Sequence, residues 1–365
     1  MATELPEYFK CPISLEIMSD PVILSSGHTF DRASIQRWID SGHRTCPITK
    51  LPLPDPPLLI PNHALRSLIS NYTPLPPPSP APATESDSLS QLAALISALA
   101  SPKSSPSSKL DSLSQLASLT KSNPPFRQRL TESGAVSLVL KCVDSDDPAI
   151  QEKSLSLLLN LSLDDDNKVG LVAEGAVGKL VAALHGGAAA VAATVLTSLA
   201  VVEVNKATIG AFPGAVRSLV RLLSVGKGRE RKEAATALYA ICSFPENRRR
   251  AVDCGAVPIL TRIAKSGLER AVEVLGLLGK CKEGREEMVK CDGVVEILVG
   301  FVKNGSSRGV QYGLLTLNSL CFCGERIKEQ VRYSGVLEVC MGLIEDDNEK
   351  IRRVASSLAE ILQEK

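Results

Sequence analysis

The sequence predicts a mainly α-helical protein in which a small α+β module precedes a long solenoid of helical repeats. The 365 residues are 44% hydrophobic but only 4% aromatic, whereas a large β-sandwich or barrel uses many more aromatic side chains. A glycine followed by a small or branched apolar residue recurs about every forty residues, which is typical of a solenoid. A proline-rich stretch separates these repeats from the N-terminal part of the chain.

Composition excludes several classes of protein. The 41 Lys and Arg residues balance the 40 Asp and Glu residues, so there is no general attraction to nucleic acid or to an anionic membrane. We find no apolar run long enough to insert into a membrane and no secretory signal at the N-terminus. Ten cysteines are too few for a disulfide scaffold of this length. We therefore expect reduced thiols and a cytoplasmic or nuclear location.

The first module covers residues 5–73. Short apolar runs at 22–24 and 28–30 predict a small hairpin, and the segment ASIQRWIDSG predicts a helix. The segment NHALRSLISNY predicts a second helix, with Asn62 as its N-cap. The module is therefore expected to be a small α+β unit.

A linker and a short helical region follow. Residues 74–88 carry six prolines between Pro74 and Pro82, which favour polyproline II and predict a semi-rigid spacer. Residues 89–122 contain two short Leu-rich helical stretches, 89–99 and 110–119, separated by the sequence SPKSSPSS. This region is either a helical cap over the first repeat or an irregular extra repeat.

Residues 123–365 contain about six units with the same internal order: a short polar helix, a glycine, an amphipathic helix, a polar turn and a longer Leu/Ala helix. Glycine allows a sharp turn between the first two helices because it has no Cβ. Three helices per forty residues in this order resemble the armadillo repeat. The resemblance implies a right-handed α-solenoid whose third helices line a groove that binds segments of other proteins. The six glycines are Gly134, Gly175, Gly214, Gly255, Gly293 and Gly335.

Two features of the repeats bear on their partner. Import receptors with this fold grip basic peptides with a ladder of Asn and Trp, but here the ladder is broken: Asn160 has no Asn equivalents and Trp38, the single Trp, lies outside the repeats. We interpret Asn160 as a structural polar residue. Residues 227–250 hold seven basic and three acidic residues, which indicates either a patch for an acidic partner or, as we favour, solvated turns.

The N-terminal module contains two matching loops, Cys11-Pro12-Ile13 and Cys46-Pro47-Ile48, in an order that resembles the zinc-binding RING finger. That fold needs eight Cys or His ligands for two tetrahedral ions. Only three of the eight positions here are Cys or His, so no metal is expected. The other five positions carry hydroxyl or carboxyl groups, which suit a buried hydrogen-bond network instead. The eight positions are Cys11, Ser14, Ser26, His28, Asp31, Ser34, Cys46 and Thr49.

A RING shape held by hydrogen bonds rather than metal is the U-box, and residues 5–73 closely resemble that family. The resemblance implies binding of a ubiquitin-conjugating enzyme charged with ubiquitin, through Ile13 and Leu15 in the first loop, Trp38 on the helix and Pro47 in the second loop. It also places Lys50 where active modules often hold a residue that bridges the conjugating enzyme and ubiquitin. Cys11 and Cys46 are interpreted as buried structural thiols rather than nucleophiles.

A U-box followed by armadillo repeats resembles the plant U-box/armadillo ubiquitin ligases. The resemblance implies direct transfer of ubiquitin to lysines of a target protein held by the repeats, with no cofactor and no catalytic residue on this chain. Some U-boxes dimerise, so a dimer through this module stays open. The alternative function is a non-catalytic armadillo scaffold in which the U-box serves for docking only.

Overall fold

The computed structural model describes residues 7–62, 65, 66, 69 and 83–363. The chain forms two compact units, Met1–Gln91 and Leu92–Lys365, and the boundary between them falls within a helix, α3 (Ala83–Ala100). The predicted linker at 74–88 lies outside the described residues as far as residue 82. Its last part belongs to α3, since no proline follows Pro82 before Pro102 and nothing in the sequence stops a helix there.

The N-terminal module is built on a three-stranded antiparallel sheet in the order β2-β1-β3, with one helix after the second strand. The hairpin and the helix were both predicted. The two-residue strand β3 was not, because it is very short and includes a proline. The elements are η1 (Glu7–Phe9), β1 (Pro21–Ile23), β2 (Thr29–Asp31), α1 (Arg32–Asp40) and β3 (Ile60–Pro61).

The core of the module is small, so each of its members matters. Phe9, Phe30 and Ile35 are completely buried and join the N-terminal turn, the hairpin and α1. The predicted second helix lies mostly outside the described residues. Asn62 nevertheless accepts a hydrogen bond from the backbone N–H of Leu65 at 3.0 Å, as expected of an N-cap.

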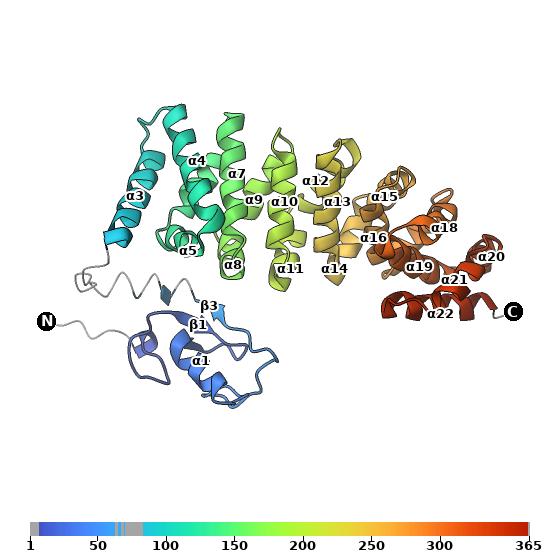
Figure 1. Cartoon of the computed structure of the whole chain (residues 1–365), viewed down its shortest axis with the longest axis horizontal. Helices are drawn as coiled ribbons and strands as arrows, with labels where there is room; N and C mark the ends of the chain where they lie inside the picture. The colour runs from blue at the N-terminus through green and yellow to red at the C-terminus, as the bar shows by residue number, and fades with distance from the viewer. Residues whose placement is uncertain (1–6, 63–64, 67–68, 70–82, 364–365) are drawn as a thin grey trace. The chain divides into compact units, whose positions relative to one another are not determined.

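The solenoid consists of helix triplets, and the described residues from α5 onward form six of them (Figure 1). The first helix of each triplet is short and mostly polar, as predicted, because only one side of it packs on the core. These first helices are α5 (Pro124–Glu132), α8 (Asp165–Ala173), α11 (Glu203–Ala211), α14 (Pro245–Asp253), α17 (Lys282–Val289) and α20 (Glu325–Tyr333).

The turn between the first and second helices is made by the repeated glycine. All six glycines adopt positive φ, between 73° and 87°, a conformation that a side chain with a Cβ disfavours. The predicted reason for the repeat is therefore confirmed. The second helices are α6 (Val136–Val143), α9 (Ala176–Ala183), α12 (Ala215–Val225), α15 (Ala256–Lys265), α18 (Val294–Asn304) and α21 (Val336–Leu343).

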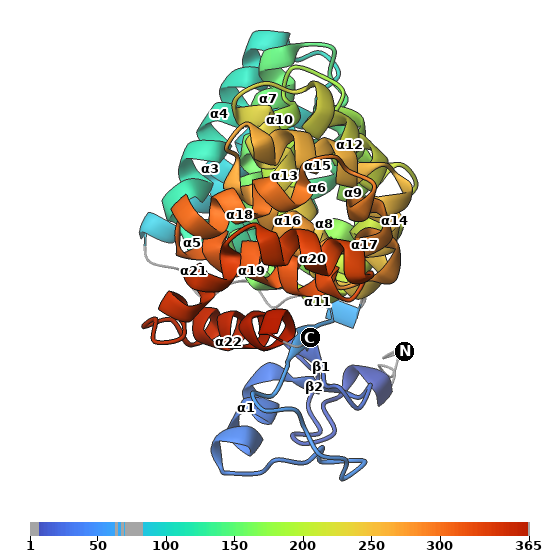
Figure 2. The same ribbon diagram turned by 90° about the vertical axis from the view of Figure 1, so that its right-hand side faces the viewer.

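The third helices pack side by side in one layer, each against the next (Figure 1). In the view turned by 90°, successive triplets overlap and are turned progressively relative to one another (Figure 2). We call the exposed surface of this layer the third-helix face. The third helices are α7 (Pro148–Leu161), α10 (Ala189–Leu199), α13 (Arg229–Cys242), α16 (Glu269–Leu278), α19 (Ser307–Cys321) and α22 (Glu349–Gln363).

Helices α3 and α4 (Pro106–Ser122) precede the triplets. Ser105 caps α4 by accepting from the N–H of Ser108, and Pro106 stands at its first position, where no donor is lost. Helix α4 packs on α7 in the same way as each third helix packs on the next. It therefore occupies the place of a third helix in the layer, ahead of the first triplet.

A buried asparagine joins successive triplets. Asn205 donates from Nδ2 to the carbonyls of Leu199 (3.0 Å) and Lys168 (3.1 Å), which satisfies the end of one third helix and links it to the preceding first helix. Asn247 makes the same two contacts one triplet later, at 3.0 and 2.8 Å. None of the described helices has the length and apolarity needed to cross a membrane.

Candidate partner-binding site of the N-terminal module

Two loops of the module share one backbone conformation. In residues 11–16 the first N–H bonds the last carbonyl at 2.7 Å, and in residues 46–51 the equivalent distance is 2.8 Å. The fifth residue of each loop, Leu15 or Lys50, has φ near +60°, which is strained for a residue other than glycine. Both loops are therefore held in a fixed and costly shape that exposes their tips.

Seven of the eight residues predicted to form one polar network lie in two separate clusters. In the first, the Asp31 carboxylate accepts hydrogen bonds from the N–H and hydroxyl of Ser19 (2.8 and 3.1 Å) and from the N–H of Asp20 (2.9 Å). The Asp31 N–H donates to the Cys11 sulfur at 3.2 Å. Ser14 also bonds the Cys11 sulfur, so this cluster fixes the first loop to the start of α1.

The second cluster holds the other loop. The Ser26 hydroxyl donates to the Cys46 sulfur at 3.1 Å, and Thr49 bonds the same sulfur. The ring of His28 lies 3.1 Å from the Ser26 carbonyl through Nδ1. Of the eight predicted residues, Ser34 is placed differently: it is buried on α1 and lines the surface depression described below.

The electrostatics of the two thiols follow from these contacts. Burial raises the pKa of Cys46, but hydrogen bonds from Ser26 and Thr49 lower it more, and the result is a pKa of about 7. Burial also raises the pKa of Cys11, while hydrogen bonds from Ser14 and Asp31 bring it below its usual value. Both thiols are fully inaccessible to solvent. Within the described residues, no three His, Cys, Asp or Glu side chains come together as metal ligands would.

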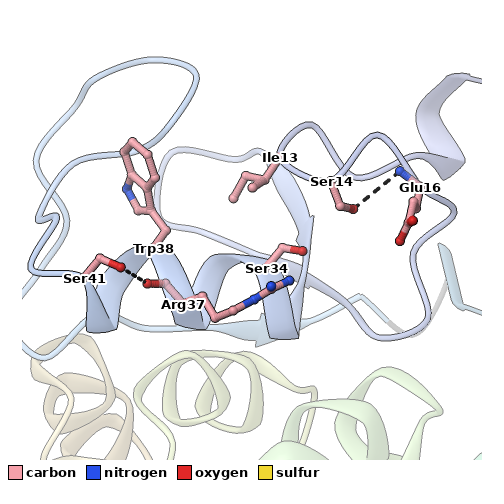
Figure 3. Close-up of a pocket in the computed structure, with 7 residues that line it drawn as sticks. All are labelled: Ile13, Ser14, Glu16, Ser34, Arg37, Trp38 and Ser41. Atoms are coloured by element: carbon pink, nitrogen blue, oxygen red, sulfur yellow. Dashed lines mark hydrogen bonds between the residues drawn. The ribbon is translucent and has the colours of Figure 1, made fainter.

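A depression of about 530 Å³ opens beside α1 (Figure 3). Ile13 points across it from the first loop toward Trp38 on the helix, so two of the four residues predicted to bind the conjugating enzyme face one another there. The complete lining is Ile13, Ser14, Glu16, Ser34, Arg37, Trp38 and Ser41.

Trp38 connects this depression to the second loop. Its indole N–H donates to the carbonyl of Thr45 at 2.9 Å, and the His43 ring stacks on it at 3.9 Å between ring centroids. Lys50 lies with its Nζ 5.8 Å from the centre of the indole and donates to the Pro47 carbonyl at 2.8 Å. The indole is therefore fixed in one orientation, which suits an anchor for a partner.

Leu15 and Pro47 do not line the depression. Leu15 is 73% exposed at the strained tip of the first loop, and Pro47 is half-buried in the second loop. Glu16, Arg37 and Ser41 also line the depression and were not predicted from the sequence. The helical spacing of Ser34, Trp38 and Ser41, at intervals of four and three residues, could have placed Ser41 on the same face of α1.

The structure also decides two questions about the repeats. Asn160 donates to the Ala117 carbonyl (2.7 Å) and to the Thr120 hydroxyl (3.2 Å) of α4, so its role is structural, as interpreted. Some basic side chains of the run at 227–250 form hydrogen bonds within the fold. Arg248 donates to the carbonyls of Cys242 and Ser243 at the end of α13, and Arg231 donates to the Leu223 carbonyl.

Comparisons with known proteins agree with this architecture. Residues 5–74 match the model of the U-box domain, and residues 91–364 match the model of the plant U-box protein ARM repeat region. U-box domain-containing protein 8 of Arabidopsis thaliana is 61% identical over 367 residues, which cover 99% of this chain and 98% of that protein. U-box domain-containing protein 17 of the same plant is 33% identical over 87% of this chain and 46% of its own length.

Among solved structures, the crystal structure of an engineered protein has a TM-score of 0.67 with 22% sequence identity. The match covers 74% of this chain and 68% of that one. It therefore concerns the fold of the helical repeats.

Proposed function

The chain belongs to the plant U-box proteins with an ARM repeat region, a ubiquitin-ligase family, and on this premise we propose that it transfers ubiquitin to a protein held by its repeats. In this proposal the U-box recruits a conjugating enzyme that already carries ubiquitin as a thioester. The ubiquitin then passes directly to a lysine of the target. No residue of this chain forms a covalent intermediate.

The observation that carries the proposal is the pairing of Ile13 and Trp38 across the depression beside α1. A rigid aromatic side chain next to an exposed aliphatic one is typical of the anchor points where most binding energy concentrates. Pro47 and Leu15 extend this surface from the two loop tips, where both backbones are fixed. Rigid anchors lower the entropic cost of binding the conjugating enzyme.

Direct transfer is supported by the state of the module's cysteines. A nucleophile that accepts ubiquitin must reach a thioester on another protein, but the sulfurs of Cys11 and Cys46 are enclosed and hydrogen-bonded. Catalysis would then consist of bringing the thioester and the target lysine together and restricting their geometry. Lys50 is the residue proposed to contact the bound ubiquitin; in this structure its Nζ donates to the Pro47 carbonyl.

The test is a reconstituted self-ubiquitination assay with activating enzyme, a panel of conjugating enzymes, ubiquitin and ATP. We expect activity from the wild type, including after pretreatment with EDTA, provided that Mg²⁺ is kept in excess of EDTA for the ATP-dependent activating enzyme. Ile13→Ala and Pro47→Ala should reduce the rate by about tenfold or more, because each removes part of the anchor surface. Leu58→Ala is the matched control, since Leu58 is 59% exposed in the same module but does not line the depression.

Absence of activity with every conjugating enzyme, from protein shown to be folded, would favour the non-catalytic scaffold. Equal loss in Leu58→Ala and Ile13→Ala would contradict the assignment of the binding surface while leaving the ligase activity itself established.

A further inference from the structure

A cluster of aromatic and charged side chains stands on the third-helix face at the C-terminal half of the solenoid. The hydroxyls of Tyr239 on α13 and Tyr312 on α19 lie 2.6 Å apart, although 73 residues separate them and α16 lies between these two helices in the layer. They meet above Gly276 of α16, where a Cβ would come within 2.7 Å of the Tyr312 ring. The contact links the third triplet to the fifth, whereas solenoid repeats usually contact only their neighbours.

Two arginines surround this pair. Arg270 lies 4.9 Å and Arg308 lies 6.0 Å from the centre of the Tyr239 ring. Both approach the same carboxylate, that of Glu273, which is buried: Arg270 at 2.5 Å and Arg308 at 3.8 Å. The carboxylate of Glu269 on the same helix is also ionised, because the Ser306 groups that bond it lower its pKa. Two carboxylates therefore face two guanidinium groups, and what sets Arg308 apart is its hydrogen bonding rather than a surplus of charge.

Arg308 is the member of the cluster that is available to bind a further anion. The Arg308 side chain is 59% exposed, and its distance of 3.8 Å from Glu273 is too long for a hydrogen bond. The neighbouring carboxylate of Glu269 is occupied, because it accepts hydrogen bonds from the N–H and hydroxyl of Ser306 at 2.7 and 2.6 Å. Arg308 therefore presents unused donors beside the ring of Tyr239.

The tyrosine pair adds one more donor. When one hydroxyl donates to the other, the second still has a hydrogen to donate. Burial and the contact with Tyr239 raise the pKa of Tyr312, so that this hydrogen is retained at physiological pH. The cluster thus offers guanidinium and phenol donors to an incoming anion. The hydrogen bonds between the two tyrosines and between Arg270 and Glu273 are already formed.

We propose that Arg308, Arg270 and the Tyr239–Tyr312 pair form a binding site for a carboxylate side chain in an acidic segment of the target protein. A planar guanidinium matches the two oxygens of a carboxylate, and the unused donors of Arg308 favour Asp or Glu side chains over neutral ones. This inference rests on the proposed function, in which the repeats hold the target. It adds the chemical class of the segment that they recognise.

The experiment measures fluorescence anisotropy of the full chain with a fluorescein-labelled, glutamate-rich peptide. We expect saturable binding that weakens about tenfold when glutamine replaces every glutamate in the peptide. Arg308→Gln should also weaken binding about tenfold, and Tyr312→Phe about threefold, since it removes a single neutral hydroxyl. Arg217→Gln is the matched control: it removes an exposed arginine from α12, a second helix.

Circular dichroism would confirm that each variant is folded. Equal losses in Arg308→Gln and Arg217→Gln would overturn the proposal, because the binding would then be non-specific attraction. Equal affinity for the glutamate and glutamine peptides would overturn it as well. Preference for a phosphoserine version of the peptide, with no binding of the glutamate version, would replace the carboxylate by a phosphate and so refute the stated class.

Self-ubiquitination keeps this test separate from that of the proposed function. Arg308→Gln should retain full self-ubiquitination, because that reaction needs no target in the repeats. A wild type that binds the peptide without ubiquitinating itself would reject the ligase and keep the site. A wild type that ubiquitinates itself without binding the peptide would reject the site and keep the ligase.

Discussion

The U-box and the armadillo solenoid stabilise their turns in different ways. In the U-box, a single polar group holds a loop through several hydrogen bonds, as the Asp31 carboxylate does for Ser19 and Asp20. In the solenoid, one type of contact is repeated along the chain, as with Asn205 and Asn247. We therefore expect the loss of one such contact to destabilise the whole U-box, whereas in the solenoid it should weaken only one interface between triplets.

The position of the single tryptophan allows each unit to be followed separately. Trp38 lies in the U-box, so its fluorescence reports on that module alone. Far-ultraviolet circular dichroism is dominated by the helices of the solenoid. Urea unfolding recorded by both signals therefore tests the comparison directly.

The largest effect is expected for Asp31→Ala. The change removes the shared acceptor of three part-buried hydrogen bonds, and should destabilise the U-box by about 3 kcal/mol. The Trp38 transition should move to lower urea while the helical signal keeps its midpoint. Asp40→Ala is the control, because Asp40 is exposed and accepts a hydrogen bond from the exposed side chain of Gln36. A common shift of both signals would show that the two units do not unfold independently.

A smaller effect is expected for Asn247→Ala in the solenoid. Asn247 is fully buried, and its loss leaves the carbonyls of Ile241 and Lys206 without this donor, at a cost of about 2 kcal/mol. Here the helical transition should shift or broaden, while the Trp38 transition stays in place. Asn304→Ala should leave both unchanged, since Asn304 is exposed. A shift of the Trp38 transition alone would contradict this expectation, because the substitution would then destabilise the U-box and not the solenoid.

The smallest effect concerns pH and the Cys46 thiol. Its pKa is about 7 in the folded module against an ordinary value of 9.0, so between these values the unfolded chain binds more protons. Stability from this thiol is therefore fully present above about pH 9 and is lost as the pH falls through 7.

Wild type and Cys46→Ser should accordingly diverge by about 1 kcal/mol in the free energy of unfolding of the U-box as the pH rises from 7 to 9. Trp38 fluorescence in urea measures the difference, and Cys340→Ser in the solenoid is the control. A constant difference across this range would show that the thiol does not titrate with the folding reaction.

Features with a local cause could be read from the sequence. The six repeated glycines predicted sharp turns, and all six have positive φ because only glycine adopts that conformation without strain. The hairpin and α1 followed from short apolar runs and a helical period. The strand β3 was missed, since two residues carry no periodic signal and its pairing with β1 is non-local.

The candidate site was only partly predictable. The family resemblance pointed to Ile13 and Trp38, which share the depression, but Arg37 and Glu16 join them through the packing of the first loop on α1. The basic run at 227–250 looked like one feature in the sequence. The fold divides it, because Arg231 and Arg248 bond backbone carbonyls of their own surroundings.

The sequence by itself thus determined the fold class, the helical repeat and its glycine turns, because these depend on neighbours within a few residues. Only the tertiary structure decided which polar groups meet. Asn160 reaches α4 across 43 residues, and Tyr239 meets Tyr312 across 73. Such contacts depend on how the triplets stack, and the stacking is set by burial of the whole apolar core rather than by any local pattern.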